Sequence, residues 1–169
     1  MAEPIRPDGP LSWFGLLVIG ATVAVDQLSK QWALSALPEG QVIDLLPILS
    51  LYRVNNPGIA FSFLADLGGL PLILVTIAIT AVVLAFWITG KDGGRPAALG
   101  YALIVGGALG NLVDRLLHGH VIDFLLLHFG TRTLFVFNLA DAALTLGPAI
   151  LILVYIFAGR ESREDGGPT

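Results

Sequence analysis

Four long apolar segments constrain this chain more than any other feature of its sequence. They cover, with approximate ends, residues 11–34, 67–89, 97–114 and 137–158. An α-helix needs roughly 20 apolar residues to cross about 30 Å of hydrocarbon, and each segment comes close to that length. The pattern therefore predicts an integral membrane protein with four transmembrane helices.

The composition of the 169-residue chain agrees with a bilayer as its solvent. Hydrophobic residues make up 55% and charged residues 13%, so a soluble fold would have too little polar surface to cover its apolar mass. The net charge is -4 and there is no basic stripe, which argues against nucleic acid as a partner. The absence of cysteine excludes disulfides, thiolate nucleophiles and zinc–thiolate sites.

The distribution of basic residues predicts the orientation of the helices. The ends of the chain and the linker after the second segment hold Arg6, Lys91, Arg95, Arg160 and Arg163. The two other connections hold mainly Arg53 and Arg132. Because cytoplasmic loops carry the excess of Lys and Arg, we expect both termini in the cytoplasm.

We expect one membrane domain, residues 1–159, followed by a disordered cytoplasmic tail, residues 160–169. The connections outside the membrane would be residues 36–66 and 116–135. In the first of these, Ile48–Val54 alternates well enough to suggest a strand, with Asn56-Pro57-Gly58 as its turn. In the second, apolar neighbours of Asp123 suggest a short interfacial helix or loop. The predicted fold class is an all-α membrane protein with a small extracytoplasmic β-sheet.

The first apolar segment resembles a short signal-peptide core, but we expect it to be retained. A single base, Arg6, precedes it, and no small-residue cleavage site lies before Asp26. Asp26 and Lys30 are spaced i,i+4 and share a helical face. A charge at mid-helix costs about 2.5 to 3.5 kcal/mol on insertion scales, so the pair needs an explanation. It either ties helices together or contacts a substrate.

Alternating crossings bring polar residues from distant segments to one membrane face. These residues are Asp26, Lys30, Asn56, Asp114, Arg115, Asp123, Asn138 and Asp141. The spacing of Asn111 and Asp114 is repeated by Asn138 and Asp141, so each pair shares a helical face and the two pairs could face each other. Gly106 and Gly110 have the small-xxx-small spacing that lets another helix approach closely.

Asp123 and Asp141 are expected on the same side of the membrane. Two carboxylates brought close do not both ionise readily, so one keeps a proton while the other acts as a base toward water. This is the chemistry of an aspartic protease. The alternative is structural: Asp123 caps a short helix and Asp141 bonds a neighbouring helix.

Other kinds of site and function have weaker support. A metal site built from His118, His120, Asp123 and His128 would lack both cysteine and an HExxH pattern. A dyad of Ser29 and Lys30 is disfavoured because adjacent helical residues point about 100° apart. A proton-coupled transporter would need polar groups distributed through the bilayer. A non-enzymatic assembly or lipid-binding protein, in which the Asn-x-x-Asp pairs only join helices, stays open.

The chain resembles the lipoprotein signal peptidases, the bacterial signal peptidase II family, in five motifs that occur in order. They are DQLSK at Asp26–Lys30, NPGIAFS at Asn56–Ser62, GGALGNLVDR at Gly106–Arg115, VIDF at Val121–Phe124 and FNLAD at Phe137–Asp141. The resemblance implies a membrane aspartyl protease that cleaves prolipoproteins just before a cysteine carrying diacylglycerol. It implies no metal or organic cofactor. It also implies a multi-pass monomer of the bacterial inner membrane, with its site near the outer face and lipid around it.

The resemblance assigns roles residue by residue. It implies Asp123 and Asp141 as the catalytic pair, with Asp114 as a rival for Asp123. Asp123 is favoured because Arg115 and Asn111 offer Asp114 a structural role. The resemblance implies substrate binding by Asn56, Gly58, Asn111, Arg115 and Asn138, and structural support by Asp26, Lys30 and Asp114. Ile59 replaces a residue that is commonly small in the family, which affects the expected shape of the nearby substrate groove but not the carboxylates.

Overall fold

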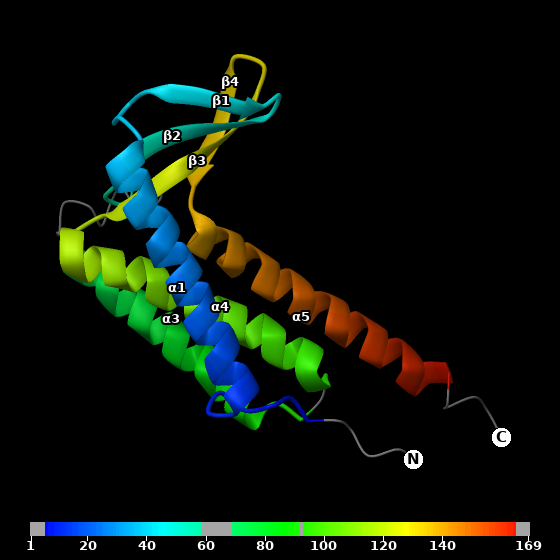
Figure 1. The fold of residues 1–169 in the computed structure, drawn as a ribbon. Coiled ribbons are helices and arrows are strands. Elements are labelled where there is room, and N and C mark those ends of the chain that lie inside the picture. The colour runs from blue at the N-terminus through cyan, green and yellow to red at the C-terminus, as the bar shows by residue number, and fades with distance from the viewer. Residues whose placement is uncertain (1–5, 59–68, 92, 165–169) are drawn as a thin grey trace.

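The computed structural model describes residues 6–58, 69–91 and 93–164. Its helices are α1 (Trp13–Ala36), α3 (Gly69–Thr89), α4 (Gly94–His118) and α5 (Leu139–Glu164). Its strands are β1 (Val42–Leu46), β2 (Leu49–Asn56), β3 (Val121–Phe129) and β4 (Arg132–Phe137). The helices run side by side along much of their length, and the sheet stands at one end of them (Figure 1). The start of α1 and the end of α5 lie at the opposite end.

Three of the helices are long and apolar enough to cross a membrane: α3 from Leu70 to Thr89, α4, and α5 from Leu139 to Phe157. These overlap the predicted second, third and fourth spans. Helix α1 overlaps the predicted first span but is not among the three, and it carries Asp26, Gln27 and Lys30. A crossing by α1 therefore stays a prediction. Helix α5 continues to Glu164, beyond its predicted end, and residues 165–169 lie outside the described part of the chain.

Glycines let α4 lie directly against its neighbours. A Cβ at Gly106 would come within 2.7 Å of Thr22 on α1, and one at Gly107 within 2.6 Å of the Ala140 carbonyl oxygen on α5. A Cβ at Gly110 would lie 2.6 Å from Asp26 Oδ2. The expected close approach at Gly106 and Gly110 is therefore confirmed, since no larger residue fits between these backbones.

The end of the bundle away from the sheet is held by an aromatic cluster and the segment before α1. Trp87 is buried and stacks on Tyr101 with ring centroids 5.9 Å apart. Its Nε1 donates to the Asp8 carbonyl oxygen at 2.7 Å, so the entering chain crosses the end of α3. Ser12 then caps α1 by accepting from the Gly15 amide at 3.0 Å.

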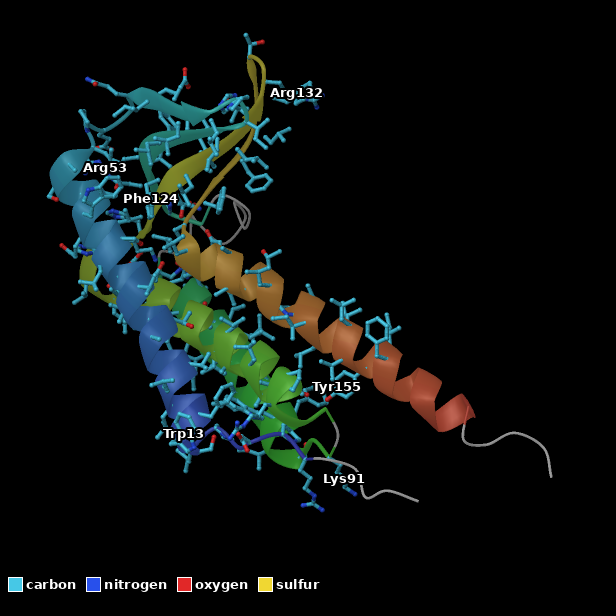
Figure 2. The ribbon with its side chains drawn as sticks, turned by 45° about the vertical axis from the view of Figure 1, so that its right-hand side comes forward. Trp13, Arg53, Lys91, Phe124, Arg132 and Tyr155 are labelled. Carbon is cyan, nitrogen blue, oxygen red and sulfur yellow. The ribbon has the colours of Figure 1, made fainter. Side chains whose placement is uncertain are left out.

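The four strands form one antiparallel sheet in the order β1-β2-β3-β4. The predicted strand at Ile48–Val54 is confirmed by β2. Phe124 packs with Ala33 and Leu37 and thereby joins the sheet to the end of α1 (Figure 2). The register of β2 against β3 shifts between Leu51 and Val54, which gives β2 a bulge next to the pair Val54–Asp123.

The prediction of an interfacial helix or loop around Asp123 is wrong, because this segment forms β3 and β4. "All-α" is accordingly too narrow a class for a chain whose helices carry a four-stranded sheet. The run Val121–Phe129 is almost continuously apolar and begins with four buried residues. Such a run has no period that separates a buried strand from a buried helix. Gly119 and Gly130, both with positive φ, bound the strand at its two ends.

A matched pair of glycine substitutions tests the close α4–α5 contact. Gly107→Ala should destabilise the protein by about 1 to 3 kcal/mol, because the added methyl group forces α4 and α5 apart. Gly20→Ala is the control, since a Cβ there meets nothing within 4 Å. It should leave stability unchanged or raise it by up to about 1 kcal/mol through helix propensity. Thermal unfolding in detergent measures both, and equal melting temperatures would contradict the packing argument.

Candidate active site

A cluster of buried polar side chains lies where the ends of α1, α4 and α5 meet the sheet. Its buried members are Asp26, Lys30, Asn111, Asp114, Asp123 and Asn138. They come from segments more than 100 residues apart in the sequence, and the hydrogen bonds described below connect all of them. The predicted convergence on one end of the bundle is therefore confirmed for the members of this set other than Asn111, and for Asn56 and Asp141. Asn111 is an additional member.

Lys30 lies at the centre of a buried ionic triad. Its Nζ is 2.8 Å from Asp26 Oδ2 and 2.8 Å from Asp114 Oδ2, and the three side chains are at most 1% exposed. Gln27 adds hydrogen bonds from its Nε2 to Asp114 Oδ1 at 2.9 Å and to the Gly110 carbonyl oxygen at 3.1 Å. Gln27 is not among the site residues predicted from the sequence, although its position next to Asp26 was an available signal.

The triad also holds the two elements that carry the candidate catalytic residues. Asp26 Oδ1 accepts from the Ala140 amide at 2.9 Å, in the first turn of α5. Asp114 Oδ2 accepts from the Ile122 amide at 3.1 Å, in β3. These bonds favour the structural interpretation of Asp26 and Lys30, since both residues are enclosed and bonded within the protein.

Asp141 lies in the first turn of α5, where Asn138 precedes the helix. The Asn138 Oδ1 accepts from the Asp141 amide at 2.9 Å, and Asp141 Oδ2 accepts from the Asn138 amide at 3.2 Å. This reciprocal arrangement is a capping box. The positive end of the helix dipole stabilises a negative charge at this place.

Asp123 lies on β3 and is 1% exposed. Its two carboxylate oxygens accept from amide groups: Oδ2 from Asn56 Nδ2 at 2.8 Å and Oδ1 from Asn138 Nδ2 at 2.6 Å. Burial raises the pKa of the Asp123 carboxyl from 3.8 to about 6, and the charge of Asp141 adds to the rise, while the bonds from Asn56 and Asn138 oppose it. The environment thus favours a protonated Asp123 more than it would an exposed aspartate.

A single amide, Asn138, joins the two candidate catalytic aspartates. It donates to Asp123 through Nδ2 and accepts from the Asp141 backbone through Oδ1. Asn111 completes the connection by donating from Nδ2 to Asp141 Oδ1 at 2.8 Å. Asn138 Nδ2 also donates to Asn111 Oδ1 at 3.2 Å, so the two Asn-x-x-Asp pairs do face each other.

Asp114, the rival of Asp123, has other partners than expected. The sequence favoured a structural role for it through Arg115 and Asn111, whereas the structure bonds it to Lys30, Gln27 and the Ile122 amide. Both of its oxygens are occupied and it is 1% exposed. Its geometry therefore supports a structural role, by a different set of contacts.

The two remaining predicted binding residues border the cluster. Arg115 is half-buried and its Nη1 donates to the Asn111 carbonyl oxygen at 3.4 Å; its charge interacts with Asp141, Asp114 and Asp123. Gly58 has φ +98° and its amide donates to Asn56 Oδ1 at 2.9 Å. An added Cβ there would overlap Leu72, so the position requires glycine. Ile59 lies outside the described residues.

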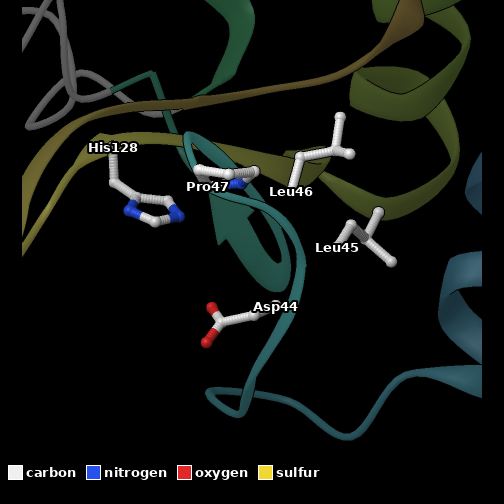
Figure 3. A pocket seen from close by; sticks show the side chains of 5 residues that line it. All are labelled: Asp44, Leu45, Leu46, Pro47 and His128. Atoms are coloured by element: carbon white, nitrogen blue, oxygen red, sulfur yellow. The ribbon is translucent and has the colours of Figure 1, made fainter.

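The structure gives little support to the alternative sites. In the part of the chain that the structure describes, no group of three or more His, Cys, Asp or Glu residues is placed to hold a metal. His128 instead lies in a shallow pocket beside Asp44, Leu45, Leu46 and Pro47, five residues along β3 from Asp123 (Figure 3). Its Nε2 is 2.8 Å from Ser50 Oγ. Ser29 bonds the Asp26 carbonyl oxygen, while Lys30 is taken up by the triad.

The chain is similar to known proteins along most of its length. The family model described as signal peptidase (SPase) II matches residues 18–157. The lipoprotein signal peptidases of Brucella ovis and Brucella canis are each 45% identical over 151 residues, which cover 89% of this chain and 94% of theirs. A bacterial membrane enzyme solved by the in meso method at 2.3 Å has TM-score 0.75 and 24% identity, with 100% of this chain and 98% of that chain covered. A second bacterial membrane enzyme, solved by the same method at 1.9 Å, has TM-score 0.74 and 26% identity, with 92% of this chain and 97% of that chain covered.

The burial of Asp123 predicts a pH-dependent loss of stability. With its pKa raised from 3.8 to about 6, native Asp123 holds its proton to higher pH than unfolded Asp123. The contribution of Asp123 to the free energy of unfolding is therefore complete below about pH 4. It falls by up to about 3 kcal/mol as the pH rises through 6. Thermal unfolding from pH 4 to 7 should show the wild type losing stability relative to Asp123→Asn. A difference between the two proteins that does not vary with pH would refute this.

Proposed function

The chain belongs to the signal peptidase II family, whose members remove signal peptides from prolipoproteins, and we propose that Asp123 and Asp141 form the aspartic pair with which it does so. The observation that carries the proposal is the pairing of two aspartates through one amide, Asn138, at the end of a membrane bundle. The protein is thus a membrane protease, and prolipoproteins are its substrates. The roles of individual residues are the proposed part.

The different surroundings of the two aspartates suggest their roles. Asp141 at the start of α5 receives hydrogen bonds from Asn111 Nδ2 and the Asn138 amide, and both bonds stabilise a carboxylate. Asp123 is the more enclosed group and has its pKa raised to about 6. We therefore assign Asp141 as the base toward water and Asp123 as the initial proton donor.

The proposed reaction has two steps. Asp141 takes a proton from water as the oxygen adds to the scissile carbonyl carbon. Asp123 then gives its proton to the nitrogen of the modified cysteine as the carbon–nitrogen bond breaks, leaving a carboxylic acid and an amine. Transfer of the proton on Asp141 to Asp123 restores the starting state. All atoms come from one water molecule and the peptide bond, so no cofactor is required.

The position of the site fits a substrate with acyl chains. A cysteine carrying diacylglycerol keeps its acyl chains in lipid while its peptide bond must meet water, and only the boundary of the membrane allows both. Arg115 and Gly58 are the proposed substrate contacts at the edge of the cluster. Asn56 and Asn138 are also proposed to bind the extended peptide, in addition to their bonds with Asp123.

We further propose that α1 is a fourth membrane span. Its two charges, Asp26 and Lys30, are buried against α4 and pair with each other. The face that it leaves exposed carries Leu16, Leu17 and Leu28 together with other apolar residues. A helix with this apolar surface can face lipid even though the buried polar residues lower its mean hydropathy. Both termini would then be cytoplasmic and the sheet would lie at the outer face of a bacterial inner membrane.

A proton or ion path is the principal alternative function. Such a path needs polar groups along the depth of the membrane. The buried polar and charged side chains of the described residues, apart from Ser50 in the sheet, are those of the cluster at the sheet end of the helices. The other end of the bundle is closed by apolar packing around Trp87 and Tyr101. The distribution therefore favours the protease.

Cleavage of a synthetic diacylglyceryl-cysteine prolipoprotein by the purified full chain, in detergent with EDTA, tests the catalytic pair. Wild type should cleave just before the cysteine. Asp123→Asn and Asp141→Asn should each lose at least about 1,000-fold in kcat, because each removes one partner of the proton transfer. Asp114→Asn should lose less than about tenfold.

Two controls accompany this assay: one checks that each variant is folded, and the other checks that Ser29 is not the nucleophile. Each variant should melt cooperatively in detergent, and Ser29→Ala should cleave as well as wild type. Loss of cleavage in Asp114→Asn and Asp141→Asn, with retention in Asp123→Asn, would move the pair to Asp114. Absence of cleavage by folded wild type would remove the enzyme proposal.

Cysteine labelling tests the orientation, because the chain has no cysteine of its own. Thr131 and Lys91 are exposed, and Arg132, next to Thr131, and Lys91 lie at opposite ends of the molecule (Figure 2). In intact spheroplasts, a membrane-impermeant maleimide should label Thr131→Cys and should label Lys91→Cys only after lysis. The reverse pattern would invert the proposed topology, and labelling of both before lysis would exclude a membrane between them.

A further inference from the structure

We propose that Lys30 is a positioning residue for peptide cleavage, and that it acts through Asn111 on the carboxylate of Asp141. The proposal rests on the function proposed above and adds a role for Lys30, which acts on the base through the bond that Asn111 makes to it. Lys30 was expected to be structural support, and Asn111 was expected to bind the substrate. The contacts of the two side chains point instead to a chain of hydrogen bonds that ends at the base.

The three N–H groups of the Lys30 ammonium match three buried acceptors. They are Asp26 Oδ2 at 2.8 Å, Asp114 Oδ2 at 2.8 Å and Asn111 Oδ1 at 2.9 Å. An ammonium has three donors and no acceptor, so Lys30 has no further hydrogen bond to offer. Ion pairing with the two carboxylates accounts for two of the three bonds. The third goes to an uncharged amide and requires another explanation.

That third bond fixes which way the Asn111 amide points. The Asn111 Oδ1 receives one bond from Lys30 and one from Asn138 Nδ2 at 3.2 Å. Both of these groups are donors, so only the oxygen of Asn111 can face them. Its Nδ2 must then lie on the other side, where it donates to Asp141 Oδ1 at 2.8 Å.

A reversed Asn111 amide would place its oxygen against the Asp141 carboxylate and its N–H groups against Lys30 and Asn138. Each of those contacts is unfavourable in a buried site. Lys30 therefore selects the single orientation in which Asn111 holds the base. A neighbour that does not itself react can raise the rate by holding a reacting group in the correct geometry.

The same accounting argues against Asn111 as a primary substrate contact. Asn111 is 5% exposed, its oxygen has two bonds, and one of its two N–H groups is directed at Asp141. Substrate binding and positioning of the base make different kinetic predictions. Loss of a binding residue raises KM, whereas loss of a positioning residue lowers kcat with KM unchanged.

The first test is Asn111→Leu, which has nearly the same shape and no hydrogen-bonding group. Cleavage of the diacylglyceryl-cysteine prolipoprotein should show kcat lower by about 10- to 100-fold and KM within about threefold of wild type. Thermal unfolding in detergent checks that the variant is folded. An unchanged kcat with a raised KM would make Asn111 a binding residue and overturn the proposal.

The second test removes Lys30 without leaving two unpaired buried carboxylates. The double variant Lys30→Met with Asp114→Asn keeps the net charge of the triad at one negative charge, and Asp114→Asn alone is its matched control. The double variant should have kcat at least tenfold below that of the control. Adding Asn111→Leu to both should abolish this difference, because effects that pass through one residue are not additive.

Each outcome leads to a decision. Equal kcat in the double variant and its control would leave Lys30 without a positioning role. A difference that persists in the presence of Asn111→Leu would show that Lys30 acts by another route. If the double variant does not fold, an unchanged kcat in Asn111→Leu still overturns the proposal, because Lys30 is proposed to act only through Asn111. Failure of wild type to cleave is a separate result, which removes the proposed function and this inference with it.

Discussion

The buried ammonium of Lys30 is the interaction on which the rest of the structure depends. A charge inside a membrane bundle is tolerated only when it is paired and fully hydrogen-bonded. The acceptors that meet this requirement each hold another element: Asp26 bonds the start of α5, Asp114 bonds β3, and Asn111 bonds Asp141. The pairing and hydrogen bonding of one cation therefore align three helices and the central part of the sheet.

The glycines of α4 make this arrangement possible. Gly110 lies directly against the Asp26 carboxylate, and Gly106 and Gly107 bring α1 and α5 to backbone contact. Short polar side chains such as Asn111 can reach across helices only at this separation. Close packing in the apolar part of the bundle and hydrogen bonding at its polar end are thus two consequences of the same small residues.

The two candidate catalytic aspartates acquire different properties from the elements that carry them. Asp141 stands at a helix start, where backbone amides and the helix dipole favour negative charge. Asp123 stands on a buried strand beside a bulge of β2, where the loss of water raises its pKa. A pair with unequal surroundings divides the tasks of acid and base without any difference in residue type.

The sequence by itself determined the apolar helices, because their length is set by the thickness of a bilayer, and it indicated the polar cluster, because charges in such helices need partners. The motifs that resemble the signal peptidase II family contain the residues of this polar cluster. Tertiary structure alone decided that Val121–Phe129 is a strand, since an apolar run without a period fits a helix equally well. It also decided that Asp114 bonds Lys30 and Gln27, and which way Asn111 points. These choices depend on distances between segments, which no spacing along a chain contains.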